Sequence, residues 1–84
     1  MSKAEKRLDG MRQNPRDGWT IKDIQSVCDN ENITCSAPKR GDHYKISHPD
    51  RPEILTIPAT RPIKPFYIQR LLAFIGRVRE ENDG

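Results

Sequence analysis

A histidine among basic residues is the feature of this sequence best suited to act on a polyanion. Lys39 and Arg40 precede His43 closely, and Lys45 follows it. An imidazole takes or gives a proton near neutral pH, and neighbouring ammonium or guanidinium groups stabilise the charge that develops on a phosphoryl group. These residue types at this spacing favour a site that binds or cuts a phosphate backbone.

The charge of the chain is concentrated around this histidine. The 84 residues carry 15 Lys and Arg against 12 Asp and Glu, a net charge of +3, yet residues 39–70 hold seven basic residues against three acidic ones. A basic stretch attracts phosphate backbones through counterion release. We therefore expect Arg61 and Lys64, in the connector before the last predicted helix, to bind a phosphate backbone together with Lys39, Arg40 and Lys45. An ordinary solvated surface is the alternative.

The cysteines and the second histidine have weaker chemical interpretations. Cys28, Cys35, His43 and His48 could be drawn as a zinc site, but both thiols occupy core positions of predicted elements while His43 faces outward. We expect reduced, packed thiols, no metal and no cofactor, with a disulfide or a metal pair as the alternative. His48 has the opposite strand parity from His43, so we expect it to stabilise a turn.

Strands must position the candidate histidine. Alternation of apolar and polar residues predicts three strands, over residues 33–37, 43–47 and 54–57. In the second strand Tyr44 and Ile46 would face the core, whereas His43 and Lys45 would face solvent. Gly41 can supply the positive φ angle of the hairpin connection that precedes them.

Helices are predicted on both sides of these strands. Thr20 and Asp23 resemble a capping box, and the helix that follows should end near residues 29–30. A second amphipathic helix should begin at Pro65, because proline suits the first helical position and apolar residues follow at helical spacing. A short N-terminal helix is allowed by three apolar residues, Ala4, Leu8 and Met11.

The order of elements predicts an α+β fold with two layers, α-β-β-β-α, in which two helices cover one face of a three-stranded antiparallel sheet. A chain of this length holds one core, which we place in residues 19–79. Residues 1–18 would be an arm, either a short helix or flexible, and residues 80–84 a frayed tail. No segment is apolar enough for a membrane span or a signal peptide, so we expect a cytoplasmic protein.

The order of motifs resembles that of the HicA-like toxins of bacterial toxin–antitoxin pairs. Its most specific parts are a Gly-x-His hairpin at 41–43, a His-Pro turn at 48–49 and an Ile-Lys-Pro helix start at 63–65. The resemblance runs from about Asn14 to Val78. It implies a fold like that of a double-stranded-RNA-binding domain and the activity of an mRNA interferase, a metal-independent endoribonuclease inhibited by a HicB-type antitoxin.

The resemblance implies that His43 is the catalytic residue and that mRNA is the substrate. The chain departs from the family at Asp42, where serine is usual, and a carboxylate there would repel an incoming phosphate. A non-catalytic RNA-binding module of the same fold is therefore the alternative hypothesis. A domain that binds only protein is the third.

Overall fold

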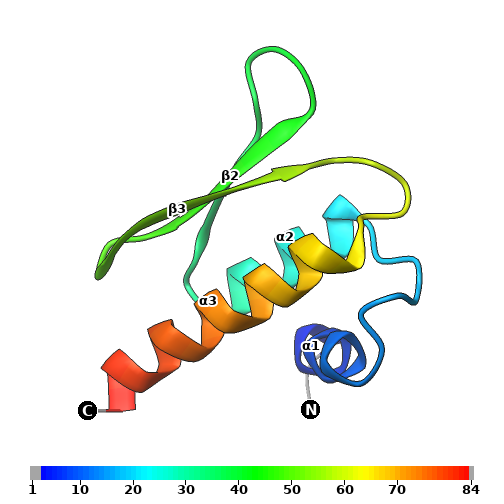
Figure 1. The fold of residues 1–84 in the computed structure, drawn as a ribbon. Helices are drawn as coiled ribbons and strands as arrows, with labels where there is room; N and C mark the ends of the chain where they lie inside the picture. The colour runs from blue at the N-terminus through cyan, green and yellow to red at the C-terminus, as the bar shows by residue number, and fades with distance from the viewer. Residues whose placement is uncertain (1–2, 84) are drawn as a thin grey trace.

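The computed structural model of the chain describes the backbone of residues 3–83 and the side chains of residues 3–80. Its fold is α+β, with a three-stranded antiparallel sheet, as the sequence predicts (Figure 1). No helix in the described residues is long and apolar enough to cross a membrane. The elements in chain order are α1 (Lys3–Gln13), α2 (Ile21–Asn30), β1 (Thr34–Ser36), β2 (His43–His48), β3 (Arg51–Pro58) and α3 (Pro65–Asp83).

The sheet has β2 in the middle, paired with β1 on one side and with β3 on the other. Ile46 of β2 lies opposite Cys35 of β1 and Leu55 of β3, and Tyr44 lies opposite Ile57. Opposed residues share a face, so these side chains form the inner face of the sheet. Helices α2 and α3 lie below this face, and the other face carries no described helix (Figure 1).

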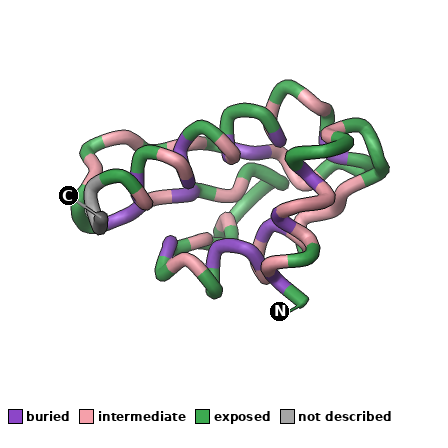
Figure 2. Tube along the Cα trace, turned by 90° about the horizontal axis from the view of Figure 1, so that it is seen from below, coloured by how far each residue is buried: buried purple, intermediate pink, exposed green. Residues whose placement is uncertain are grey.

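One apolar core joins the inner face of the sheet to the helices. Buried positions recur along each helix between exposed ones (Figure 2), as expected for amphipathic helices. At the start of α2, the Asp23 carboxylate accepts hydrogen bonds from the backbone N–H of Thr20 at 2.9 Å and from its hydroxyl at 3.0 Å. This is the predicted capping contact. The largest fully buried side chains include Phe74, Leu8, Met11, Ile24, Ile46, Ile57, Ile63, Ile68, Leu71 and Ile75.

The N-terminal segment is part of this core. Helix α1 packs against α2 and α3 on the side away from the sheet (Figure 1), and only 1% of Leu8 and none of Met11 is exposed. Close packing at Gly10 explains the glycine there, since a Cβ atom would lie 2.8 Å from the ring of Trp19. The segment predicted as an arm outside the core therefore contributes side chains to it.

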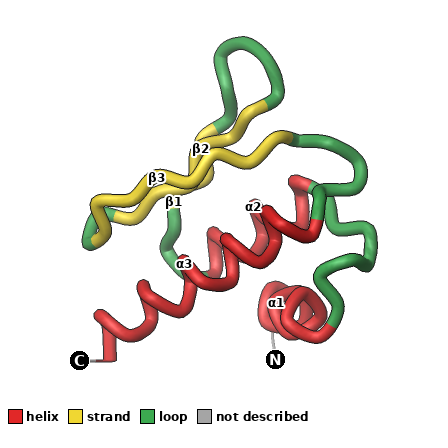
Figure 3. Tube along the Cα trace, viewed as in Figure 1, coloured by secondary structure: helices red, strands yellow, loops and turns green. Residues whose placement is uncertain are grey.

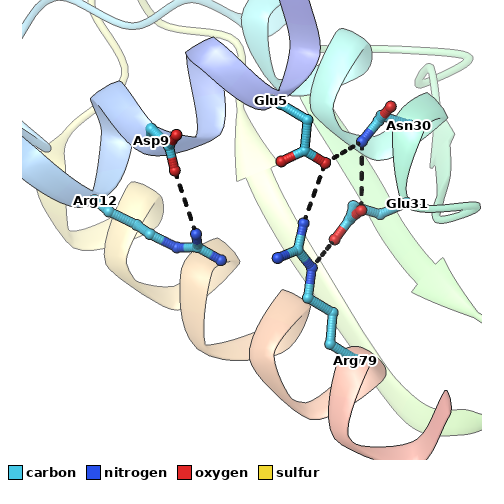
Figure 4. A network of polar contacts seen from close by, with 6 residues as sticks. All are labelled: Glu5, Asp9, Arg12, Asn30, Glu31 and Arg79. Carbon is cyan, nitrogen blue, oxygen red and sulfur yellow. Dashed lines mark hydrogen bonds and ion pairs between the residues drawn. The ribbon is translucent and has the colours of Figure 1, made fainter. Parts of the chain in front are cut away.

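A polar network joins the three helices at one end of the molecule (Figure 4). The Arg79 guanidinium of α3 binds Glu31, the residue after α2, and its Nη2 lies 3.5 Å from the Glu5 carboxylate of α1. The Asn30 amide also donates to Glu5, at 2.9 Å. These contacts fix the last turns of α3 against α1 and α2.

The strands and the last helix have boundaries that differ from the predicted ones. Helix α3 continues to Asp83, so residues 80–83 are helical rather than frayed, and residue 84 lies outside the described residues. Strand β3 begins at Arg51, earlier than predicted, because the turn before it is tight. The backbone N–H of Asp50 donates to Nδ1 of the buried His48 at 3.1 Å, which confirms the predicted turn-stabilising role of that histidine.

The packing of α1 predicts a large loss of stability on Met11→Ala. Removing this fully buried side chain should lower the free energy of unfolding by about 2–5 kcal/mol, measured by urea denaturation. Lys6→Ala, at an exposed position of the same helix, is the control and should change it by less than about 0.5 kcal/mol. Equal effects of the two substitutions would show that α1 does not pack as described.

Candidate functional site

A pocket of about 570 Å³ lies where the β1–β2 hairpin loop meets the sheet. The loop, residues 37–42, projects beyond the sheet on the side away from the helices (Figure 3). The pocket therefore opens to solvent beside the uncovered face of the sheet. The residues that line it are Ser36, Ala37, Pro38, Lys39, Arg40, His43 and Lys45.

The strand pairing directs His43 and Lys45 to the pocket. Both lie on the face of β2 opposite to Ile46, and Lys45 stands across from Ser36 of β1. The predicted parity of β2 is thereby confirmed. The base of the loop is held by a backbone hydrogen bond of 2.7 Å from the N–H of Ala59 to the carbonyl of Asp42.

A carboxylate orients the imidazole of His43. Nδ1 of His43 lies 3.0 Å from Oδ1 of Asp42, and the two side chains are 63% and 58% exposed. With Nδ1 engaged, Nε2 is the ring nitrogen that remains for proton transfer with a bound molecule. The sequence indicated that the two residues are adjacent, but it did not predict this contact.

Three cationic side chains line the same pocket as the imidazole. Lys39, Arg40 and Lys45 are exposed, and none of them forms an ion pair with a described side chain. Asp42 follows Arg40 closely in the chain, but its carboxylate contacts the imidazole of His43. The cationic groups are therefore available to an anion in the pocket.

The other predicted site residues lie elsewhere. Arg61 and Lys64 are exposed in the connector between β3 and α3, and neither lines the pocket. Their binding to RNA stays a prediction. His48 is 9% exposed on the inner side of β2, so it cannot act together with His43.

The two cysteines contact each other between α2 and β1. Cys28 is buried and Cys35 is half-buried, and both are free thiols. Their hydrogen bond raises the pKa of Cys28, with burial adding to the effect, and lowers the pKa of Cys35. Within residues 3–83 no group of three or more His, Cys, Asp or Glu side chains is arranged to hold a metal ion.

Comparison with known proteins does not assign the chain to a family. It matches no family model, and neither a curated protein nor a solved structure matches it. The likeness to HicA-like toxins therefore stays a sequence-based prediction. The function must be argued from the pocket itself.

The thiol contact predicts different reactivities for the two cysteines. Iodoacetamide at about pH 8 should alkylate Cys35 at least tenfold faster than Cys28, because Cys35 is more exposed and its pKa is lowered. Mass spectrometry of peptides from the folded protein measures both rates, and alkylation in urea is the control that should bring them close together. Faster alkylation of Cys28 in the folded protein would contradict this assignment.

Proposed function

We propose that this chain is an endoribonuclease that binds RNA in the loop pocket and cleaves it with His43, as the toxin of a toxin–antitoxin pair. The observation that carries the proposal is the pocket itself. It combines one oriented, exposed imidazole with Lys39, Arg40 and Lys45, which carry no competing ion pairs among the described side chains. The resemblance to HicA-like toxins supports the same assignment of His43.

The chemistry assigns separate tasks to these groups. Nε2 of His43 takes the proton of the ribose 2′-hydroxyl as that oxygen attacks the adjacent phosphorus. Lys39, Arg40 and Lys45 stabilise the negative charge that grows on the phosphoryl oxygens. Asp42 holds Nδ1 and so keeps Nε2 directed outward, although its charge also opposes the approach of phosphate. The two effects of Asp42 act in opposite directions.

An inhibitor of this activity would have to cover the uncovered face of the sheet. The pocket is bounded by one projecting loop and two strands, with no helix of the described residues above it. A HicB-type antitoxin that places acidic groups on Lys39, Arg40 and Lys45 would block both the imidazole and the phosphate-binding groups. The HicB-type antitoxin is proposed as a partner because the sequence resembles HicA-like toxins.

A non-catalytic RNA-binding module is the second candidate. His43 is the only one of the seven pocket-lining residues whose side-chain type exchanges protons near neutral pH, so the pocket has no second histidine or carboxylic acid for the departing 5′-oxygen. In the enzyme hypothesis that proton comes from solvent. Binding of RNA with no cleavage under any condition would favour the module.

The catalytic hypothesis predicts a severe effect of His43→Ala on cleavage. The variant should cut a single-stranded RNA substrate at least about 100-fold more slowly, since it lacks the base. Its free energy of unfolding should change by less than about 0.5 kcal/mol, because the imidazole is exposed. Wild-type rates in the variant would remove His43 from the mechanism.

The binding hypothesis predicts that RNA affinity depends on the cations of the pocket. Replacing Lys39, Arg40 and Lys45 together by Gln should weaken binding and reduce the slope of log K against log salt by about 2. The matched control removes three exposed charges elsewhere, on α1 and α2: Lys3, Lys6 and Lys22 to Gln. Equal losses in both triple variants would show that only net charge matters.

A further inference from the structure

Among residues 3–83, no strand lies beside the outer edge of β3. In the strand order β1-β2-β3 this strand has a neighbour on one side only. Ala59 stands opposite Asp42, and its N–H donates a hydrogen bond to the Asp42 carbonyl. The two residues therefore form one of the hydrogen-bonded pairs of the ladder, in which both residues direct their backbone groups at each other. Because such pairs alternate along an antiparallel ladder, Ile57 and Leu55 are the next residues of β3 whose backbone groups face β2.

The intervening residue, Thr56, directs its backbone N–H and C=O groups toward the open side of β3. Ile54 precedes Leu55 on this strand, at the point where the register of the ladder shifts. Pro58 has the same parity as Thr56, opposite His43, and proline is tolerated in a strand where its nitrogen faces away from the partner. The strand therefore presents a short stretch of unpaired backbone that ends at this proline.

A second pocket, of about 240 Å³, lies between this edge and α3. It is lined by residues 54–57 of β3 together with Tyr67 and Arg70 of α3. Ile54, which lines it, is 63% exposed, and Phe66, which stacks edge-on with Tyr67, is 56% exposed. Unpaired strand backbone next to exposed apolar side chains is the arrangement that accepts an added strand.

The charge at this edge is positive. Arg70 lies over the ring of Phe66, 5.4 Å from its centroid, and no described carboxylate is within ion-pair distance of it. Farther along the same helix, Arg77 binds Glu53 of β3 at 3.2 Å. Helix α3 thus offers two arginines beside β3, and of these two only Arg77 has a carboxylate partner among the described side chains.

We propose that the free edge of β3 receives an extended, acidic segment of a partner protein. The segment adds a strand beside Ile54 and Thr56, and one of its carboxylates binds Arg70 as Glu53 binds Arg77. A second copy of this chain fits less well, since pairing the same edges would bring two copies of Arg70 together, and the Glu53 carboxylate of β3 already binds Arg77. This inference concerns a surface distinct from the loop pocket and does not depend on the proposed function.

The test uses the full chain labelled with ¹⁵N and two capped octapeptides, one alternating valine with glutamate and one alternating valine with lysine. At about 1 mM, the glutamate peptide should shift the amide resonances of Ile54 and Thr56 and slow the exchange of the Thr56 N–H with solvent at least tenfold. The lysine peptide should leave them unchanged. Protection by neither peptide, or equal protection by both, would overturn the proposal.

Backbone pairing is tested at Thr56. Thr56→Pro removes the outward N–H at a position whose parity matches that of Pro58, whereas Thr56→Val keeps the N–H and removes only the hydroxyl. The proline variant should lose binding of the glutamate peptide and the valine variant should keep it. The dispersion of the remaining amide resonances shows that each variant is folded. Unchanged binding by the proline variant would exclude strand addition at this edge.

The ionic contact is tested at Arg70. Arg70→Gln should weaken binding of the glutamate peptide about tenfold, and Lys22→Gln, an equal loss of charge at an exposed position of α2, should leave it unchanged. Two other occupants give distinct results. Protection of Thr56 that rises with protein concentration alone indicates a second copy, and protection by an oligoribonucleotide but not by the peptide indicates RNA. Either result would overturn the proposal.

Discussion

The pairing of β2 with both of its neighbours is the constraint on which the core and the candidate site depend together. Successive side chains of a strand point to opposite faces, so the register that buries Ile46 also exposes His43 and Lys45. A slip of one residue would bring Lys45 into the core and is strongly disfavoured. Burial of the inner face beneath α2 and α3 therefore stabilises the outward position of the imidazole on the opposite face of the sheet.

The hairpin loop depends on the same pairing. Asp42 closes the ladder through its carbonyl, which accepts the N–H of Ala59, and its carboxylate contacts His43. One residue thus anchors the base of the loop and orients the ring. Lys39 and Arg40, by contrast, lie on the projecting part, where long side chains can adapt to an anion. Loops that a rigid scaffold positions in this way are common locations of binding and catalytic residues.

Features that depend on local pattern could be predicted from the sequence, and those that depend on distant contacts could not. The parity of β2 and the start of α3 at Pro65 follow from alternation and from the stereochemistry of proline. The burial of α1 could not be predicted from local pattern, because its polar contacts include one between Glu5 and Arg79, residues 74 positions apart. The sequence also could not show that Arg61 lies outside the loop pocket, since packing sets the path of the connector that carries it.

The sheet presents two surfaces with different recognition chemistry. The loop pocket offers cations and an imidazole on the outer face of the sheet, so it suits a phosphate. The edge of β3 offers unpaired backbone with a single uncompensated arginine, Arg70, and suits an extended peptide. Because the pocket lies at the β1–β2 loop while the edge faces away from β2, an occupant of the edge leaves His43 open. A protein bound at the edge of β3 would therefore have to reach across the uncovered face of the sheet in order to block His43.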